Sequence, residues 1–261
     1  MDRRRLLILP YALWLLGLVA APFALIVAAS FGHRDEAGLI QYGFHGESYA
    51  TLADPLYLEV FGRTLLMATL SSVLTLLAAY PAAFFLSRLD RTQAAFYLTL
   101  LLVPFWTNYL IRLLAFMDVL RLHPFGMEWT FLFRGIVAAL LYNYLPFAVL
   151  PLYSALEKVP TSVIEAALDL GASKRQVLFK VLWPLTRKPV TATFLLVFIP
   201  ALGEFLIPEL VGGGQNFYLG TFLQQQFLTV RNWPLGSAAV AILVLTATIL
   251  VSFFGKELAE E

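Results

Sequence analysis

Long uncharged stretches recur along this chain of 261 residues and limit the folds open to it. Residues 6–32 carry no charged side chain, and a second uncharged stretch separates Arg63 from Arg88. A helix needs about 20 apolar residues to cross the hydrocarbon core of a bilayer. Hydrophobic residues make up 60% of the sequence and charged residues only 13%, whereas soluble domains average roughly a quarter charged residues. The chain is therefore predicted to be an all-α integral membrane protein.

The pattern of apolar and charged residues predicts six transmembrane helices. The apolar stretch after the arginines at positions 3–5 is longer than the core of a signal peptide, so we interpret it as an uncleaved span. Cleavage near Ala21 or Ala24 is the alternative. Residues 210–230 are uncharged too, but their GGGQN and QQQ segments expose backbone and amide groups and predict an external or re-entrant loop. The predicted spans are residues 6–31, 63–87, 94–120, 135–156, 189–210 and 234–255.

The basic residues assign the two sides of the membrane. Six spans place both termini on one side, and about two thirds of the 18 lysines and arginines fall on that side. They lie in the N-terminal segment, the turn at 88–91, the loop at 157–188 and the C-terminal tail. Because basic loops remain in the cytoplasm, both termini and the 157–188 loop are predicted to be cytoplasmic. Residues 33–62, which are mildly acidic, are predicted to form an external loop with a short surface helix.

The basic loop contains the patterns of two short helices. Ser162 and Glu165 have the spacing of a capping box, and Ser173 and Gln176 repeat it. Gly171 lies between them, where a glycine in the left-handed conformation can end a helix. The prolines at positions 184 and 189 are then expected to stop or kink the second helix.

The sequence E-A-A-x-x-x-G, which ends at Gly171, resembles the signature loop of ABC importer permeases. The resemblance implies that this loop is a cytoplasmic coupling loop, whose first helix docks on an ATPase subunit. An ordinary helix-turn-helix connector is the alternative, because Ala, Glu and Gly are common residues. The docking residues it implies are Ser162, Glu165, Ala166, Ala167, Asp169, Leu170, Gly171, Ala172 and Ser173.

Ionisable and aromatic residues in the spans identify a candidate substrate pathway. Glu204 and Glu209 are placed on one helix near the far end of the fifth span, with Pro208 as a possible break. An intramembrane carboxylate faces a cavity or a partner, so Glu204 either attracts a cationic substrate or pairs with an arginine such as Arg112. Aromatic rings also suit ammonium groups, although packing is the commoner role of aromatic residues in helices. The other candidates are Trp106, Asn108, Tyr109, Asn143 and Tyr144.

Further segments resemble the spermidine/putrescine (PotB/PotH-like) family of importer permeases. They are LVPFWTNYLIR at 102–112, LPFAVLPLYSALEKV at 145–159, FIPALGEFLIPELVGG at 198–213 and WPLGSAAV at 233–240. With the E-A-A loop, the resemblance covers roughly residues 55–250. It implies the type I ABC importer permease fold and a heterodimer with a second, homologous permease. It also implies a pair of ATPase subunits, which hold ATP and Mg²⁺, and an extracytoplasmic substrate-binding protein. The external segment after the third span, MEWTFLFRG, is shorter than usual in that family. Because this loop would meet the binding protein, the details of that docking stay open.

Several functions are excluded by the sequence itself. No G-x-x-x-x-G-K-[ST] phosphate loop is present, so the chain is predicted not to hydrolyse ATP itself. As the transport subunit that the resemblance implies, it is expected to be no enzyme and to bind no cofactor of its own. It has no cysteine, its three histidines are scattered, and its net charge of +1 does not indicate nucleic acid as a partner. We therefore expect no metal site. A polyamine importer permease in the bacterial inner membrane is the leading interpretation. Permeases for thiamine, iron, sulfate or opines, an ATP-independent channel or secondary transporter, and a non-transporting scaffold or sensor are the alternatives.

Overall fold

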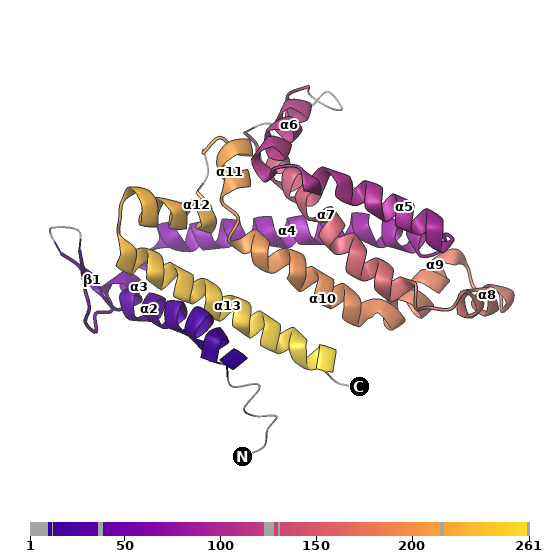
Figure 1. Cartoon of the computed structure of the whole chain (residues 1–261), viewed down its shortest axis with the longest axis horizontal. Coiled ribbons are helices and arrows are strands. Elements are labelled where there is room, and N and C mark those ends of the chain that lie inside the picture. Colours follow the sequence, from indigo (N-terminus) through magenta and orange to yellow (C-terminus); the bar gives the residue numbers. More distant parts are fainter. Residues whose placement is uncertain are drawn as a thin grey trace, which may run out of the picture. The chain divides into compact units, whose positions relative to one another are not determined.

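A computed structural model of the chain describes residues 10–11, 13–35, 39–122, 128–129, 131–214 and 217–259, with side chains described as far as residue 255. Most of these residues are helical (Figure 1). Predictions for the arginines at positions 3–5, for residues 215–216 of the GGGQN segment and for the charges of the C-terminal tail lie outside this part. Contacts divide the chain into two compact units, one of Met1–Gly62 and Leu219–Ile249 and the other of Arg63–Tyr218 and Leu250–Glu261.

The first unit combines the N-terminal span, a short hairpin and a helical C-terminal segment. Its strands pair in antiparallel register, with His33 opposite Gln41 and Arg34 opposite Ile40. Its core lies where Leu52 packs with Phe222, Leu235 and neighbouring apolar residues. The elements are η1 (Leu16–Ala20), α2 (Ala21–Ser30), β1 (His33–Arg34), β2 (Ile40–Gln41), α3 (Glu47–Leu52), α12 (Leu219–Gln224), η5 (Gln225–Thr229) and α13 (Trp233–Ala259), which continues past residue 249.

The second unit is a bundle centred on two helices, α7 (Phe133–Leu156) and α10 (Trp183–Leu202), which pack side by side (Figure 1). Leu140, Leu152 and Val197 on these helices are fully buried. Its other elements are α4 (Pro55–Leu86, from Arg63 onwards), α5 (Arg91–Leu102), η2 (Val103–Trp106), α6 (Tyr109–Arg121), α8 (Thr161–Asp169), α9 (Lys174–Gln176), η4 (Val177–Leu182) and α11 (Leu206–Val211).

Five of the six predicted spans are matched by continuous helices that are long and apolar enough to cross a membrane, within the described residues. The sixth, the predicted third span, corresponds to a sharply bent pair of helices, which forms either a broken span or a re-entrant loop. Residues 210–230 contain only short helices, as expected of a segment that does not span. The five continuous helices are Leu13–Ser30, Pro55–Leu86, Phe133–Leu156, Lys174–Leu202 and Trp233–Gly255.

The third span is not the continuous helix predicted for residues 94–120. The segments Arg91–Trp106 and Tyr109–Arg121 meet at an angle of 100°. Pro104 lies at the end of the first segment, where its missing N–H and its ring disfavour a continuing helix. Asn108 then caps the second segment, because its side chain accepts a hydrogen bond from the N–H of Leu110 at 2.9 Å.

The fifth span also differs from its prediction, because its helix begins well before Pro189. One helical segment runs from Lys174 to Leu202 and contains Pro184 and Pro189, so neither of the prolines that were expected to stop or kink the helix stops it. A π-helical stretch, Val177–Leu182, ends two residues before Pro184, so the backbone hydrogen bonding is already rearranged where the proline lacks an N–H. Membrane helices tolerate proline through such local adjustments.

The second span begins eight residues earlier than predicted, at Pro55 rather than Arg63. The Asp54 carboxylate accepts a hydrogen bond from the N–H of Leu56 at 2.9 Å, and Pro55 occupies the first helical position. Both features favour the start of a helix. The segment before the second span is therefore shorter than residues 33–62 and contains the hairpin and the expected short helix, α3.

Candidate functional site

Glu204 lies at a break between two helices, not within one. Helix α10 ends at Leu202 and α11 begins at Leu206. Glu204 and Glu209 were predicted to lie on one helix with a possible break at Pro208, but they do not share a helix, and the break lies at Glu204. The Glu204 carboxylate accepts hydrogen bonds from the N–H groups of Leu206 at 3.1 Å and Ile207 at 3.4 Å. It thus occupies the amino end of α11, where the backbone offers unpaired donors to a negative charge.

Two tyrosines bring their hydroxyl groups to the same carboxylate. Tyr109, at the start of α6, donates to Oε1 at 3.4 Å, and Tyr144, within α7, donates to Oε2 at 3.3 Å. These bonds are longer than the usual 2.5–3.0 Å of an O–H···O hydrogen bond, so each is weak. Tyr144 is buried, while Glu204 and Tyr109 remain partly exposed. Three separate elements therefore converge on one accessible carboxylate.

Of the two roles left open for Glu204, the pairing with Arg112 is not formed. Arg112 instead donates to Oδ1 of Asn143 at 2.9 Å and to the carbonyl of Pro104 at 3.3 Å. Its guanidinium also lies 4.0 Å from the ring centroid of Phe105, a favourable cation–π geometry. Arg112 thus fastens α6 to the chain before the bend and to α7. Among the residues that the structure describes, Glu204 has no ion-pair partner.

Three of the predicted pathway residues lie outside this cluster. Trp106 is 78% exposed and Asn108 uses its side chain to cap α6. Glu209 is exposed on α11. The cluster itself consists of Glu204, Tyr109 and Tyr144, with Asn143 and Arg112 beside it. A carboxylate that lacks a cationic partner and is flanked by two phenol rings can bind an ammonium group by charge and by cation–π attraction.

Helix α8 is a second candidate site, and unlike the Glu204 cluster it is an exposed surface. None of its residues is buried, and the apolar side chain of Val163 is exposed. Leu170, just after it, is 90% exposed. Exposed apolar groups on a short amphipathic helix are typical of a surface that a partner covers.

The end of α8 has the turn that was predicted, while its start differs. Gly171 has a φ of +86°, and it donates to the carbonyl of Leu168 at 2.8 Å. Ala172 donates to the carbonyl of Ala167 at 3.0 Å, so the turn is a complete Schellman motif. At the other end, the predicted capping box of Ser162 and Glu165 is wrong. The helix begins two residues earlier than that box requires, at Thr161 after Pro160, and no side chain caps it.

The second predicted capping box is confirmed. The N–H of Gln176 donates to Oγ of Ser173 at 3.3 Å, and the N–H of Ser173 donates to Oε1 of Gln176 at 2.8 Å. Ser173 therefore starts the helix that continues into the fifth span, two residues after Gly171. Residues 171–173 therefore set the direction of α8 relative to that span. Backbone hydrogen bonds hold this turn to the end of α8, and the side-chain bonds of the capping box hold it to the start of the following helix.

Arg88 links the turn after α4 to the end of α7, a contact that the sequence did not reveal. Its two terminal nitrogens donate to the carbonyls of Leu156 and Val159, each at 3.0 Å. These carbonyls lie at the end of α7, directly before α8, and the guanidinium charge is also favourable at a helix C-terminus. Arg88 therefore positions the segment from which α8 starts.

Replacing Arg88 is expected to lower thermal stability. Each hydrogen bond to a charged group contributes about 1.5–3 kcal/mol, so Arg88→Gln should lower the Tm of the detergent-solubilised chain by roughly 5 °C. A fluorescence-detected melting curve measures this shift. Arg91→Gln is the matched control, because Arg91 is an exposed arginine at the start of α5. Equal Tm values for the two variants would contradict the role given to Arg88.

The sequence was then compared with families of known proteins. Residues 56–259 match the family described as binding-protein-dependent transport system inner membrane component. The chain belongs to this family. It is also 36% identical over 256 residues to the spermidine/putrescine transport system permease protein PotB of Escherichia coli K12, covering 93% of each chain. PotB of Haemophilus influenzae is 36% identical over 257 residues, covering 92% of this permease and 89% of that protein.

Solved structures share the fold of this permease. A chain of a bacterial alginate ABC transporter, in complex with a periplasmic protein that holds an alginate pentasaccharide, superposes with a TM-score of 0.71 at 13% identity. The match covers 96% of this permease and 91% of that chain. A chain of the MetNI methionine ABC transporter, in an inward-facing conformation, gives a TM-score of 0.61 at 19% identity. That match covers 79% of this permease and 97% of the MetNI chain. The fold is therefore that of a type I ABC importer permease.

The resemblance based on the E-A-A loop is confirmed at the level of the family. The chain is a multi-pass component of the bacterial inner membrane and a subunit of an ABC importer. As a permease it belongs to the transport components of such systems and is not an enzyme.

Proposed function

We propose that this permease carries polyamines, such as spermidine and putrescine, into the cytoplasm. The observation that carries the proposal is the Glu204 carboxylate, which accepts hydrogen bonds from two tyrosines and forms no ion pair among the described residues. Polyamines are chains of ammonium groups joined by methylene segments, so a carboxylate and aromatic rings suit them. The 36% identity to PotB, a spermidine/putrescine permease by its description, supports this cargo. An anion such as sulfate would be repelled by the same carboxylate.

The partners of the proposed importer follow from its mode of action. The chain would pair with a second, homologous permease, and a pair of ATPase subunits would hold ATP and Mg²⁺ beneath them. A substrate-binding protein would deliver the cargo from outside. The excess of basic residues in the 157–188 loop supports a cytoplasmic position for α8 and for both termini. The exposed face of α8 would then dock on an ATPase.

Transport in this proposal is a change of conformation driven from outside the chain. ATP binding closes the two ATPases and moves α8. The short turn at residues 171–173 passes this movement to the fifth span, because the Schellman motif and the capping box leave few other freedoms there. The break at Glu204 lies at the far end of the same span, so the movement also reaches the carboxylate cluster. The bundle then opens outward, and the binding protein releases its cargo.

Purification with partners tests the proposal directly. The tagged chain, extracted with mild detergent from its native membrane, is expected to bring an ATPase and a second permease, which mass spectrometry identifies. The complex, reconstituted into vesicles with its binding protein, should take up radiolabelled spermidine only when ATP is supplied. Recovery of the chain alone, or as a homo-oligomer, would contradict the assembly. ATP-driven uptake of an unrelated solute, without uptake of spermidine, would contradict the cargo.

A further inference from the structure

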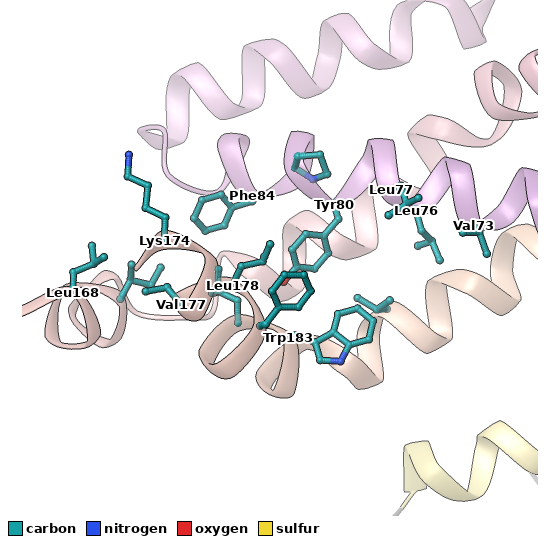
Figure 2. A pocket seen from close by; sticks show the side chains of 15 residues that line it. Val73, Leu76, Leu77, Tyr80, Phe84, Leu168, Lys174, Val177, Leu178 and Trp183 are labelled. Atoms are coloured by element: carbon teal, nitrogen blue, oxygen red, sulfur yellow. The ribbon is translucent and has the colours of Figure 1, made fainter. Parts of the chain in front are cut away.

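An apolar pocket of about 890 Å³ lies between the second half of α4 and the segment from α8 to the start of α10. Figure 2 shows its walls: Val73, Tyr80 and Phe84 come from α4, and Leu178 and Trp183 face them. All of these residues belong to the second unit. The pocket is thus a feature of one compact part of the chain.

The walls of the pocket are hydrocarbon, with a single charge at one end. The Tyr80 hydroxyl is hydrogen-bonded to Oγ1 of Thr186 at 2.9 Å, so it does not make the pocket polar. Lys174 is the only charged residue among those that line the pocket, and it extends past the end near Phe84 (Figure 2). Several apolar side chains along the pocket remain exposed, among them Phe179 at 57%. The surface therefore has room for an apolar ligand with a negatively charged end.

The length of the pocket matches one leaflet of a bilayer. Val73 and Phe84 lie eleven positions apart on α4, which at 1.5 Å per residue is about 16 Å. Half of a hydrocarbon core of about 30 Å is about 15 Å. Phe84 lies two residues before the end of α4 at Leu86, so a bilayer around this span would place Lys174 at the level of the lipid headgroups. Lysines at this level extend their ammonium groups towards the polar interface.

We propose that an anionic phospholipid occupies this pocket, with an acyl chain along α4 and its phosphate on the Lys174 ammonium group. The three N–H donors of that group suit a phosphate. A lipid of this class supplies both an apolar chain for the walls of the pocket and an anion for the lysine at its end. The inference does not depend on the cargo. It depends on the proposed function only in naming the leaflet, which is the cytoplasmic one when α8 is cytoplasmic.

The lipid would contact the parts of the chain that the proposed mechanism moves. Ile164 and Leu168 of α8 line the pocket together with α4. A bound acyl chain would therefore hold α8 against the second span. The anionic lipid content of the membrane would then affect the freedom of α8 to follow the ATPases.

Trp183 lies in the wall and can report the lipid directly. The full chain is reconstituted into phosphatidylcholine vesicles that contain a second, brominated lipid. In one set this lipid is phosphatidylglycerol and in the other it is phosphatidylcholine, each brominated on its acyl chains, since bromine quenches tryptophan fluorescence on contact. The signal of Trp183 is the difference between the chain and its Trp183→Phe variant. Brominated phosphatidylglycerol is expected to quench Trp183 with roughly fivefold higher affinity than brominated phosphatidylcholine, the preference expected of one lysine at an anionic surface.

Two variants test the part played by the charge. Lys174→Gln should remove the preference for phosphatidylglycerol, whereas Lys180→Gln, an exposed lysine of η4 that does not line the pocket, should keep it. Native mass spectrometry of the unreconstituted chain and its Lys174→Gln variant, with added phosphatidylglycerol, gives a second measure of bound lipid. Equal quenching by both lipids, or loss of the preference in Lys180→Gln as well, would overturn the proposal.

The same measurement separates lipid from protein. If no brominated lipid quenches Trp183 when the second permease is present, that subunit covers the pocket and the lipid proposal is wrong. Quenching needs neither ATP nor cargo, so a failed lipid test leaves the proposed transport function standing. A failed uptake assay in turn leaves the lipid result unaffected.

Discussion

A Gly171→Val variant is expected to insert and assemble normally but to lose most of its ATP-driven uptake. Gly171 has a φ of +86°, a conformation that a β-branched residue adopts only at a cost of about 1–3 kcal/mol. A Cβ atom added at Gly171 would meet nothing within 4 Å, so crowding contributes nothing and the cost lies in the backbone alone. Relief of this strain would break the two hydrogen bonds of the Schellman motif and change the direction of α8.

The position offers a matched control. Asparagine tolerates the left-handed conformation far better than valine, so Gly171→Asn should retain most of the transport that Gly171→Val loses. Both uptake of spermidine and ATP hydrolysis should be measured in reconstituted vesicles. The expected result for the valine variant is at least a tenfold fall in uptake, since 1.4 kcal/mol corresponds to tenfold, with hydrolysis no longer stimulated by the loaded binding protein. Normal uptake by Gly171→Val would show that residues 171–173 do not transmit the movement.

The turn after α8 shows how far local sequence can predict this fold. Gly171 and the capping box of Ser173 were predicted correctly, because each depends on a few adjacent residues. The capping box of Ser162 failed although its spacing was the same. Pro160, with its fixed φ, precedes a helix that has already begun at Thr161, and the serine is left on its first turn.

The bend in the third span and the continuity of the fifth were harder to predict, because hydropathy indicates the length of an apolar segment and not the direction of its helix. Pro104 and Asn108 are a stop and a start signal four residues apart, and together they could have indicated the 100° bend. Pro184 and Pro189 carry the same local signal and yet lie within a continuous helix. The fifth span also packs along α7 and contains a π-helical stretch, and neither feature is visible in the local sequence.

The carboxylate cluster depends on contacts between residues far apart in the chain. Glu204 was singled out because charge is rare in a span, and pairing with an arginine such as Arg112 was one of two roles left open for it. Tyr109 and Tyr144 were named as candidates for the same pathway, but their hydrogen bonds to Glu204 join residues 95 and 60 positions apart, and Arg112 is occupied by Asn143 and Pro104. Local sequence could not decide between these partners. The bend before α6 instead places Tyr109 against the carboxylate and leaves Arg112 with Asn143.

Replacing Glu204 by glutamine is expected to reduce the maximal rate of spermidine uptake by about tenfold or more. Gln keeps the shape of the side chain and one oxygen that can accept from Leu206 and Ile207, so the start of α11 should be preserved. What disappears is the negative charge, and a hydrogen bond to a charged group contributes about 1.5–3 kcal/mol. In the proposed importer the binding protein sets the apparent affinity for the cargo, so the loss should appear in the maximal rate and not in KM.

Two further variants separate the charge from its position. Glu209→Gln makes the same chemical change on an exposed residue of α11 and should leave uptake near normal. Glu204→Asp keeps the charge on a shorter side chain and should recover part of the rate that Glu204→Gln loses. Uptake is measured with radiolabelled spermidine at saturating binding protein, and the amount of inserted permease is checked for each variant. If Glu204→Gln transports at the normal rate, the carboxylate serves only to begin α11, and the cation of the cargo must be recognised elsewhere.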